Sequence, residues 1–244
     1  MGEENGAIRL TERDEQILAH VARHQITVLE AVRKLYFPDA ADETAAVKVL
    51  SRLRRGRFLN ARDLYPRRKY WTLTAAAARA RGLNPKIARP LGYDALARAF
   101  GALAFCCLGE APRSRFTPHE FRERFPSLYK PGPGASWYYV DEDDEGRKRL
   151  GLILVDKGGG YRRIARKCLD RTRQRLEIPA FRDVIVQDGF TIAVVTAWEE
   201  KKRFIEQALS DYDLYATVRI EVHPELAQLL GGRRRRETER RHES

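Results

Sequence analysis

The sequence lacks the features that mark membrane proteins and disulfide-stabilised secreted domains. No run of about 18 apolar residues occurs, so we expect no membrane-spanning helix. The first ten residues, MGEENGAIRL, are polar and acidic, unlike a signal peptide. The three cysteines are odd in number and two of them, Cys106 and Cys107, are adjacent, so neither a disulfide framework nor a metal site is indicated. We therefore expect buried free thiols and a cytoplasmic location.

Motifs of several common enzyme classes are also missing. The stretch DKGGGYRR is not a phosphate-binding P-loop, because no Gly-Lys-Ser/Thr follows at the required spacing. The chain has no His-hydrophobe-His pair, no G-x-S-x-G elbow and no Cys/His pairing that indicates a nucleophile. His20 and His24 share a helix face at positions i and i+4, but no third ligand is evident. We therefore expect no metal ion and no cofactor.

Basic charge is abundant and unevenly distributed. The chain has 46 Lys or Arg against 34 Asp or Glu, a net charge of +12. Residues 1–90 hold 18 basic against 10 acidic residues, whereas residues 91–230 hold 22 against 21. The end of the chain, residues 231–244, is basic and of low complexity, and we expect it to be disordered. This asymmetry favours a nucleic acid as the partner of the N-terminal part.

The first ninety residues predict three short helices followed by a β-hairpin and a further helix. Thr11 with Asp14 has the spacing of a capping box at the start of the first helix. The second helix begins near Thr27 and ends before Pro38, and the third runs from Asp42 to Arg55. RFLN and KYWTLT resemble two short strands, after which Thr74 caps an alanine-rich helix. This order predicts a winged helix-turn-helix domain over residues 8–83.

The third helix and the hairpin supply the candidate DNA-binding residues. With Val49, Leu50 and Leu53 assigned to the core, the outward positions of the helix are Lys48, Ser51, Arg52 and Arg55. The hairpin tip is expected to add Arg62, Arg67, Arg68 and Lys69. In helix-turn-helix proteins such a helix enters the major groove, where Arg reads guanine. The sequence thus predicts binding of double-stranded DNA. Ordinary solvated charges, or a winged helix that binds protein, remain as alternatives.

The rest of the chain predicts a mixed α/β domain. NPKIARPLG, residues 84–92, is expected to be a linker, and residues 93–108 an apolar helix. WYYV, RLGLILV and YATVRIEV are strand-like, and FRDVIVQ with FTIAVVT is expected to form one or two strands. Residues 161–177 are expected to be helical. Thr196 with Glu199 predicts a capping box for a helix through Ser210. A mixed sheet flanked by helices over residues 93–230 is the simplest solution, which makes the whole chain α+β.

This element order resembles that of the restriction-endonuclease-like fold, in which two carboxylates and a Lys hold Mg²⁺ against a phosphate. Asp141, Asp143 and Asp144 are candidates for the first carboxylate. The second position, two residues before Lys157, is Val155, and Asp156 and Lys157 should point to opposite faces of a strand. We therefore assign no catalytic residue and expect a role in dimerisation, partner binding or a lost nuclease function. A metal-dependent endonuclease, with Lys167 as a relocated lysine, remains the alternative.

Three stretches together resemble the replication-relaxation family of plasmid and integrative-element proteins. They are LTERDEQILAHVARH, VLSRLRRGRFL with YWTLT, and LILVDKGGG with KCLDR and FTIAVVTAW. Members of that family tend to carry EVDRG, so Leu154 stands here in place of an acidic residue and Lys157 in place of Arg. The resemblance implies a DNA-binding protein of a mobile element, acting in replication or gene control, with a nuclease-like domain that has lost catalysis.

Overall fold

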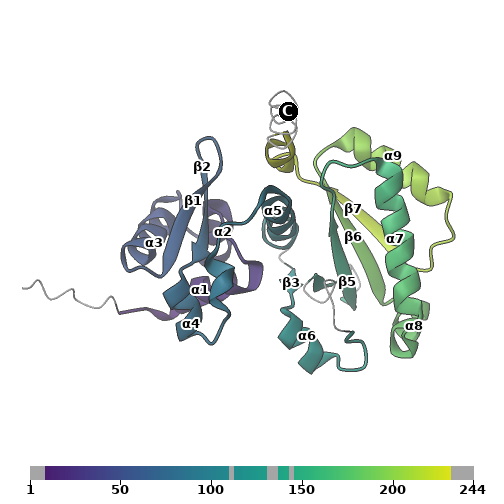
Figure 1. Cartoon of the computed structure of the whole chain (residues 1–244), viewed down its shortest axis with the longest axis horizontal. Helices are drawn as coiled ribbons and strands as arrows, with labels where there is room; N and C mark the ends of the chain where they lie inside the picture. Colours follow the sequence, from purple (N-terminus) through teal and green to yellow (C-terminus); the bar gives the residue numbers. More distant parts are fainter. Residues whose placement is uncertain (1–8, 110–112, 131–136, 143–145, 232–244) are drawn as a thin grey trace, which may run out of the picture. The chain divides into compact units, whose positions relative to one another are not determined.

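The computed structural model describes residues 9–109, 113–130, 137–142 and 146–231, which form a mixture of helices and β-sheets (Figure 1). The chain divides into two compact units, Met1–Leu91 (unit 1) and Gly92–Ser244 (unit 2). In the described part, no helix combines the length and the apolar character needed to cross a membrane. Cys106, Cys107 and Cys168 are all buried and none is in a disulfide. Burial raises the pKa of the Cys168 thiol to about 12.

Unit 1 contains the predicted series of helices and the hairpin. The elements are α1 (Glu12–His24), α2 (Leu29–Tyr36), α3 (Thr44–Arg55), β1 (Leu59–Tyr65), β2 (Arg68–Leu73) and α4 (Ala75–Ala80). Apolar residues at helical spacing bury one side of each of the first three helices. The core of the unit includes Ile17, Leu18, Val21, Val32, Ala46, Leu50, Leu53, Leu59 and Leu73. The helices and the hairpin therefore close around one shared core.

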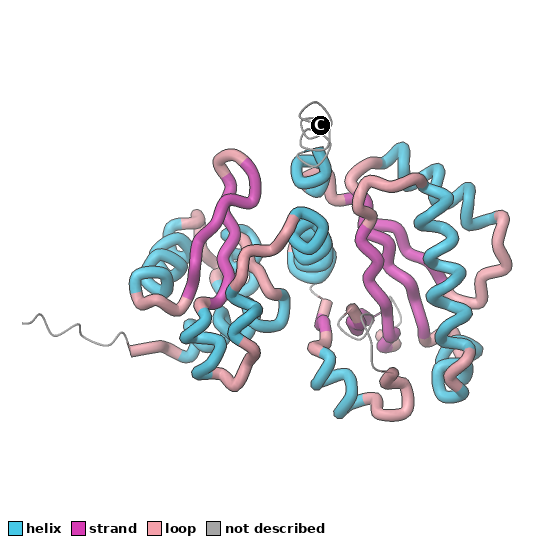
Figure 2. Tube along the Cα trace, in the orientation of Figure 1, coloured by secondary structure: helices cyan, strands magenta, loops and turns pink. Residues whose placement is uncertain are grey.

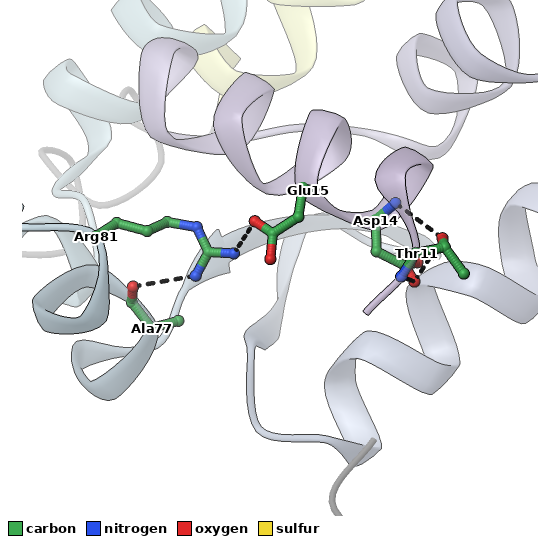
Figure 3. A network of polar contacts seen from close by, with 5 residues as sticks. All are labelled: Thr11, Asp14, Glu15, Ala77 and Arg81. Carbon is green, nitrogen blue, oxygen red and sulfur yellow. Dashed lines mark hydrogen bonds and ion pairs between the residues drawn. The ribbon is translucent and has the colours of Figure 1, made fainter. Parts of the chain in front are cut away.

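The predicted capping box at the start of α1 is confirmed. The backbone N–H of Asp14 donates to the Thr11 hydroxyl at 3.3 Å, and the Thr11 N–H donates to the Asp14 carboxylate at 2.8 Å (Figure 3). In the same region, Arg81 pairs with Glu15 at 2.5 Å and donates to the Ala77 carbonyl at 3.4 Å. These contacts hold the segment that follows α4 against the first turn of α1.

The hairpin is longer than predicted, and its turn is shorter (Figure 2). Strand β1 runs to Tyr65, which pairs with Arg68, so only Pro66 and Arg67 form the turn. Arg67 has φ 65°, the left-handed value that the position after a turn proline needs in a type II turn. A further backbone bridge joins Thr27 to Trp71, with both N–H to O distances at 2.9 Å. Because β1 extends to Tyr65, Arg62 lies within this strand and not at the hairpin tip, where the sequence analysis expected it.

Residues 84–91, most of the segment expected to be a linker, belong to unit 1 and include a short helical turn. Pro85–Ala88 forms a 3-10 helix, η1, which contacts α4 and β2. Asn84 caps this turn by accepting the Lys86 N–H at 2.9 Å, and Ala88 is buried. Pro85 occupies the first turn, where its missing N–H costs no hydrogen bond. The proline thus starts a helical turn here.

Unit 2 contains the predicted mixed sheet flanked by helices. Its elements are α5 (Tyr93–Cys107), β3 (Ser114–Arg115), α6 (Pro118–Arg124), β4 (Tyr138–Glu142), β5 (Lys148–Val155), α7 (Tyr161–Leu176), α8 (Pro179–Val186), β6 (Phe190–Thr196), α9 (Glu199–Ser210) and β7 (Thr217–Val222). The strand order is β3-β4-β5-β6-β7. The pairs up to β5 are antiparallel and those from β5 to β7 are parallel. Helix α5 covers one face, and α7 with α9 covers the other (Figure 1).

Two glycines let α5 and the sheet pack closely. A Cβ on Gly101 of α5 would lie 2.7 Å from a methyl of Val155 at the end of β5. A Cβ on Gly151 of β5 would lie 2.0 Å from the ring of Tyr139, its partner on β4. That ring is fully buried and meets Phe105 of α5 edge-on, with centroids 4.9 Å apart. The space beside Gly151 is therefore filled by an aromatic ring that belongs to the core.

Two predictions for this unit are wrong. FRDVIVQ forms most of α8, because Pro179 starts a helix whose Phe181 and Ile185, at i and i+4, are buried while Val186 is exposed. Thr196 does not cap α9. It is the buried last residue of β6, and α9 begins after Trp198 without a side-chain cap. The spacing of Thr196 and Glu199 matches a capping box, but the strand continues through the position where the cap would stand.

Candidate nucleic-acid interface

The outer face of α3 presents four polar side chains to solvent, and three of them are cationic. They are Lys48, Ser51, Arg54 and Arg55, here called the α3 surface, and all are exposed. The side chains of Ser51, Arg54 and Arg55 form no hydrogen bond or ion pair with any residue that the structure describes. Because the opposite side of the helix is packed into the core, these groups are fixed in direction and available to a partner.

Arg54 was missed by the sequence analysis. Val49 was counted as core there, but it is only partly buried, and the buried positions are Ala46, Leu50 and Leu53. The exposed arc is therefore wider than predicted and includes Arg54, three residues after Ser51. The sequence could have indicated Arg54, because it lies three residues after Ser51 and residues at i and i+3 lie on one face of a helix.

Arg52, by contrast, belongs to the structure of unit 1. Its guanidinium lies 2.5 Å from the carboxylate of Asp14, which has no exposed surface, whereas the Arg52 side chain is 32% exposed. Burial acts to raise the pKa of Asp14, but the hydrogen bonds from Thr11 and Arg52 outweigh it and lower that pKa. In the structure this side chain joins α3 to α1, and contact of Arg52 with DNA stays a prediction from the sequence.

The four basic residues assigned to the hairpin tip fall into three environments. Arg67 is exposed in the turn, and its side chain forms no hydrogen bond or ion pair with a described residue. Lys69 is exposed but lies 2.7 Å from Asp63 across the hairpin. Arg68 is mostly covered, 3.0 Å from Glu30 and 2.7 Å from the Tyr65 hydroxyl. Arg62 is partly buried and donates to the Ala88 carbonyl at 3.3 Å.

One more cation extends the α3 surface toward the hairpin. Arg57, just after α3, is exposed, and with Arg54 it lines a shallow groove of about 480 Å³ that also includes Asn60 and Thr74. The Thr74 hydroxyl donates to the Arg57 carbonyl at 2.7 Å, which fixes the backbone there. Arg54, Arg55 and Arg57 thus form a run of exposed cations at the end of α3 and directly after it.

Asp156, the carboxylate of unit 2 next to Lys157, already has partners within the protein. Asp156 has no exposed surface, and its carboxylate pairs with Lys201 of α9 at 2.5 Å and accepts from the Thr196 hydroxyl at 3.2 Å. Lys157 instead pairs with Asp94 of α5 at 2.5 Å. Both residues follow the end of β5, so strand alternation does not apply to them, and they line the same pocket. The expectation that they lie on opposite faces and cannot share one site is therefore wrong.

The other aspartates considered as metal ligands are Asp141, Asp143 and Asp144. Asp143 and Asp144 lie outside the described residues, and Asp141 is in β4, where it pairs in register with Arg149. Within each unit taken alone, the described residues contain no three His, Cys, Asp or Glu side chains close enough to hold one ion. Lys167 does line the same pocket as Asp156.

No protein-family model, no curated protein and no solved structure matches the chain. The function is therefore inferred from the side chains just described, from their charge, and from the hydrogen bonds and ion pairs that they already form.

Proposed function

We propose that the chain binds double-stranded DNA through unit 1, which acts as a winged helix-turn-helix. The observation that carries the proposal is the α3 surface, because it sets three cations on the outer face of a helix whose other face is buried. Proteins seldom leave clustered cations unpaired unless solvent or an anionic partner compensates them, and duplex DNA is a regular polyanion.

The order of elements supports this proposal. Helix α2 precedes α3 and contacts it, and the hairpin follows α3 directly. The Thr27–Trp71 bridge joins one residue between α1 and α2 to the hairpin, at the place where winged helices have an extra strand. Helix α3 has 12 residues and is therefore roughly 18 Å long. That length suits insertion into the major groove.

The roles within the interface follow from the chemistry of the side chains. Arg54 and Arg55 are placed to read guanine edges or to bind phosphates, and Lys48 and Ser51 to contact phosphates or bases. Arg67 at the turn is placed for the phosphate backbone. The resemblance to replication-relaxation proteins extends the proposal to control of replication or transcription in a mobile element.

Sequencing of duplex fragments retained by the full chain from a random pool tests the proposal directly. Enrichment of one sequence is the expected result. On that sequence, Arg54→Ala and Arg55→Ala should each weaken binding by about 1–3 kcal/mol if they read bases, and by much less on random duplex. Arg67→Gly removes the wing cation while keeping the backbone, because glycine adopts φ 65° without strain.

The control removes the same charge elsewhere in unit 1. Arg79, Lys86 and Arg89 are exposed, and they lie on α4 and around η1, outside the proposed interface. A triple Ala variant at these positions should keep the affinity of the wild type, whereas a triple variant of Lys48, Arg54 and Arg55 should lose it. If both triple variants lose the same affinity for DNA, the binding depends on the net charge of unit 1 and not on the α3 surface. Binding to a protein with no affinity for duplex DNA would favour the protein-interaction alternative.

A further inference from the structure

Unit 2 contains a basic pocket that the proposed function does not use. It lies where β5 ends and α7 begins, and its volume is about 330 Å³. The lining comes from five separate stretches of the unit, including the glycine loop after β5, helix α7 and Trp198. Pockets of roughly this size hold small organic ligands.

Asp156 organises the floor of this pocket. Besides its pair with Lys201 and the hydrogen bond from Thr196, it accepts the Gly158 N–H at 3.1 Å. Gly158 has φ 87°, a conformation that a side chain would strain, so the loop needs glycine there. The carboxylate thus holds the ends of β5 and β6, the start of α9 and the glycine loop in one arrangement.

The pocket holds more positive than negative charge. Asp156 is paired with Lys201, and Asp94 is paired with Lys157. Two further cations of the lining, Arg163 and Lys167, form no side-chain hydrogen bond or ion pair with a described residue. The described groups around the pocket therefore carry an excess of two positive charges.

Lys167 is the cation most affected by this excess. Partial burial lowers its pKa, and the nearby charges of Arg163, Lys157 and Arg171 lower it further, while Asp156 opposes them. An anion in the pocket would relieve this repulsion. A phosphomonoester carries close to two negative charges at neutral pH and has three acceptor oxygens, so it matches the excess in sign and size.

An aromatic surface borders the same pocket. Trp198 lines it and is 39% exposed, and the Lys201 ammonium lies 5.5 Å from its ring centroid. Indole rings in such positions stack with nucleobases irrespective of base identity. A charged recess beside an open ring suits a ligand that has a phosphate at one end and a flat ring at the other.

We propose that this pocket binds a nucleoside monophosphate group, with its phosphate against Lys167 and Arg163 and its base against Trp198. The group can come from a free nucleotide or from the phosphorylated end of a nucleic-acid strand, because both present the same chemistry. The inference does not depend on DNA binding by α3, since none of its residues lies in unit 1.

Titration calorimetry on the full chain tests the proposal with four probes: AMP, adenosine, and a short single-stranded oligonucleotide with or without a 5′-phosphate. Saturable binding of AMP at one site, with adenosine at least about 10-fold weaker, is expected if the phosphate is recognised. Selective binding of AMP assigns the site to free nucleotides. Selective binding of the 5′-phosphorylated strand over its 5′-hydroxyl form assigns it to strand ends. Binding of neither phosphorylated probe in the millimolar range overturns the proposal.

Variants locate the site. Lys167→Gln and Arg163→Gln should each weaken binding about 10-fold or more, and Lys167→Arg should recover part of the affinity. Trp198→Ala should weaken AMP but leave competition by inorganic phosphate unchanged. The matched controls, Arg166→Gln on α7 and Arg203→Gln on α9, remove exposed cations outside the lining. Equal weakening in the controls and in Lys167→Gln would overturn the assignment, and circular dichroism confirms that each variant is folded. Duplex without 5′-phosphates reports separately on unit 1.

Discussion

Arg52→Met separates the stability of unit 1 from recognition by the α3 surface. Asp14 has no exposed surface, and the Arg52 guanidinium lies 2.5 Å from it. Thr11 donates to the same carboxylate through its N–H and its hydroxyl, each at 2.8 Å. Methionine retains much of the aliphatic packing of Arg52 but no charge. In the variant the buried carboxylate of Asp14 keeps its hydrogen bonds from Thr11 but loses its ion pair with Arg52.

Two magnitudes limit the expected loss. Removing one partner of a fully buried ion pair costs about 3–5 kcal/mol, and removing one hydrogen bond to a charged group costs about 1.5–3 kcal/mol. The Arg52 side chain is 32% exposed, so water screens the pair and the smaller range applies. We expect the free energy of unfolding of unit 1 to fall by about 2 kcal/mol. Arg55→Met, on the same helix but with an exposed side chain, should change it by less than about 0.5 kcal/mol.

Hydrogen exchange of the α1 and α3 amides in the full chain measures this free energy without requiring both units to unfold together. Duplex binding is measured beside it. We expect a crossed result, in which Arg52→Met lowers protection but keeps affinity, and Arg55→Met does the reverse. Unchanged protection in Arg52→Met, combined with a loss of sequence-specific binding, would refute the structural role and restore Arg52 as a base-reading residue.

Three further predictions concern packing, pH and catalysis. Gly151→Ala should destabilise unit 2 by about 1–3 kcal/mol or more, because its Cβ would lie 2.0 Å from the buried Tyr139 ring. Urea unfolding measures this loss, with Gly92→Ala as the comparison, because Gly92 is exposed and has space for a Cβ. Burial, and then the charge of Arg23, lower the pKa of His20 from 6.5 to about 4, so the unfolded state binds more protons in that interval. The free energy of unfolding of unit 1 should therefore fall by up to about 3 kcal/mol as the pH falls from about 6.5 to 4. In His20→Gln this free energy, measured by amide exchange, should depend less on pH. Supercoiled DNA should stay intact with Mg²⁺ or Mn²⁺, because Lys201 already neutralises Asp156.

Each of these has a contrary outcome. If Gly151→Ala is as stable as the wild type, the Tyr139 ring must be able to move away from the added Cβ, although it is fully buried. An equal pH dependence in His20→Gln would assign the proton uptake to other groups. Cleavage that disappears in Asp156→Asn would make the endonuclease alternative the leading one for unit 2.

Much of the fold could be predicted from sequence because its causes are local. The capping box at Thr11, the cap of α4 at Thr74, and the core positions Leu50 and Leu53 of α3 involve residues within one or two helical turns. Such signals depend on hydrogen bonds and periodicities that a short segment carries by itself. The misassigned segment FRDVIVQ shows the limit, because a short apolar run with β-branched residues suits a strand or a helix equally well.

The sequence by itself determined most of the helices and strands, the excess of basic charge and its concentration in the first ninety residues. Only the tertiary structure decided which cations are available. Arg52, Arg62 and Arg68 look the same in sequence as Arg54, Arg55 and Arg67, yet their partners Asp14, Ala88 and Glu30 lie 38, 26 and 38 positions away. The pocket around Lys167 likewise assembles from distant segments. Whether a charge is satisfied depends on long-range neighbours that local propensity does not encode, and this pairing separates a structural arginine from one free to bind a ligand.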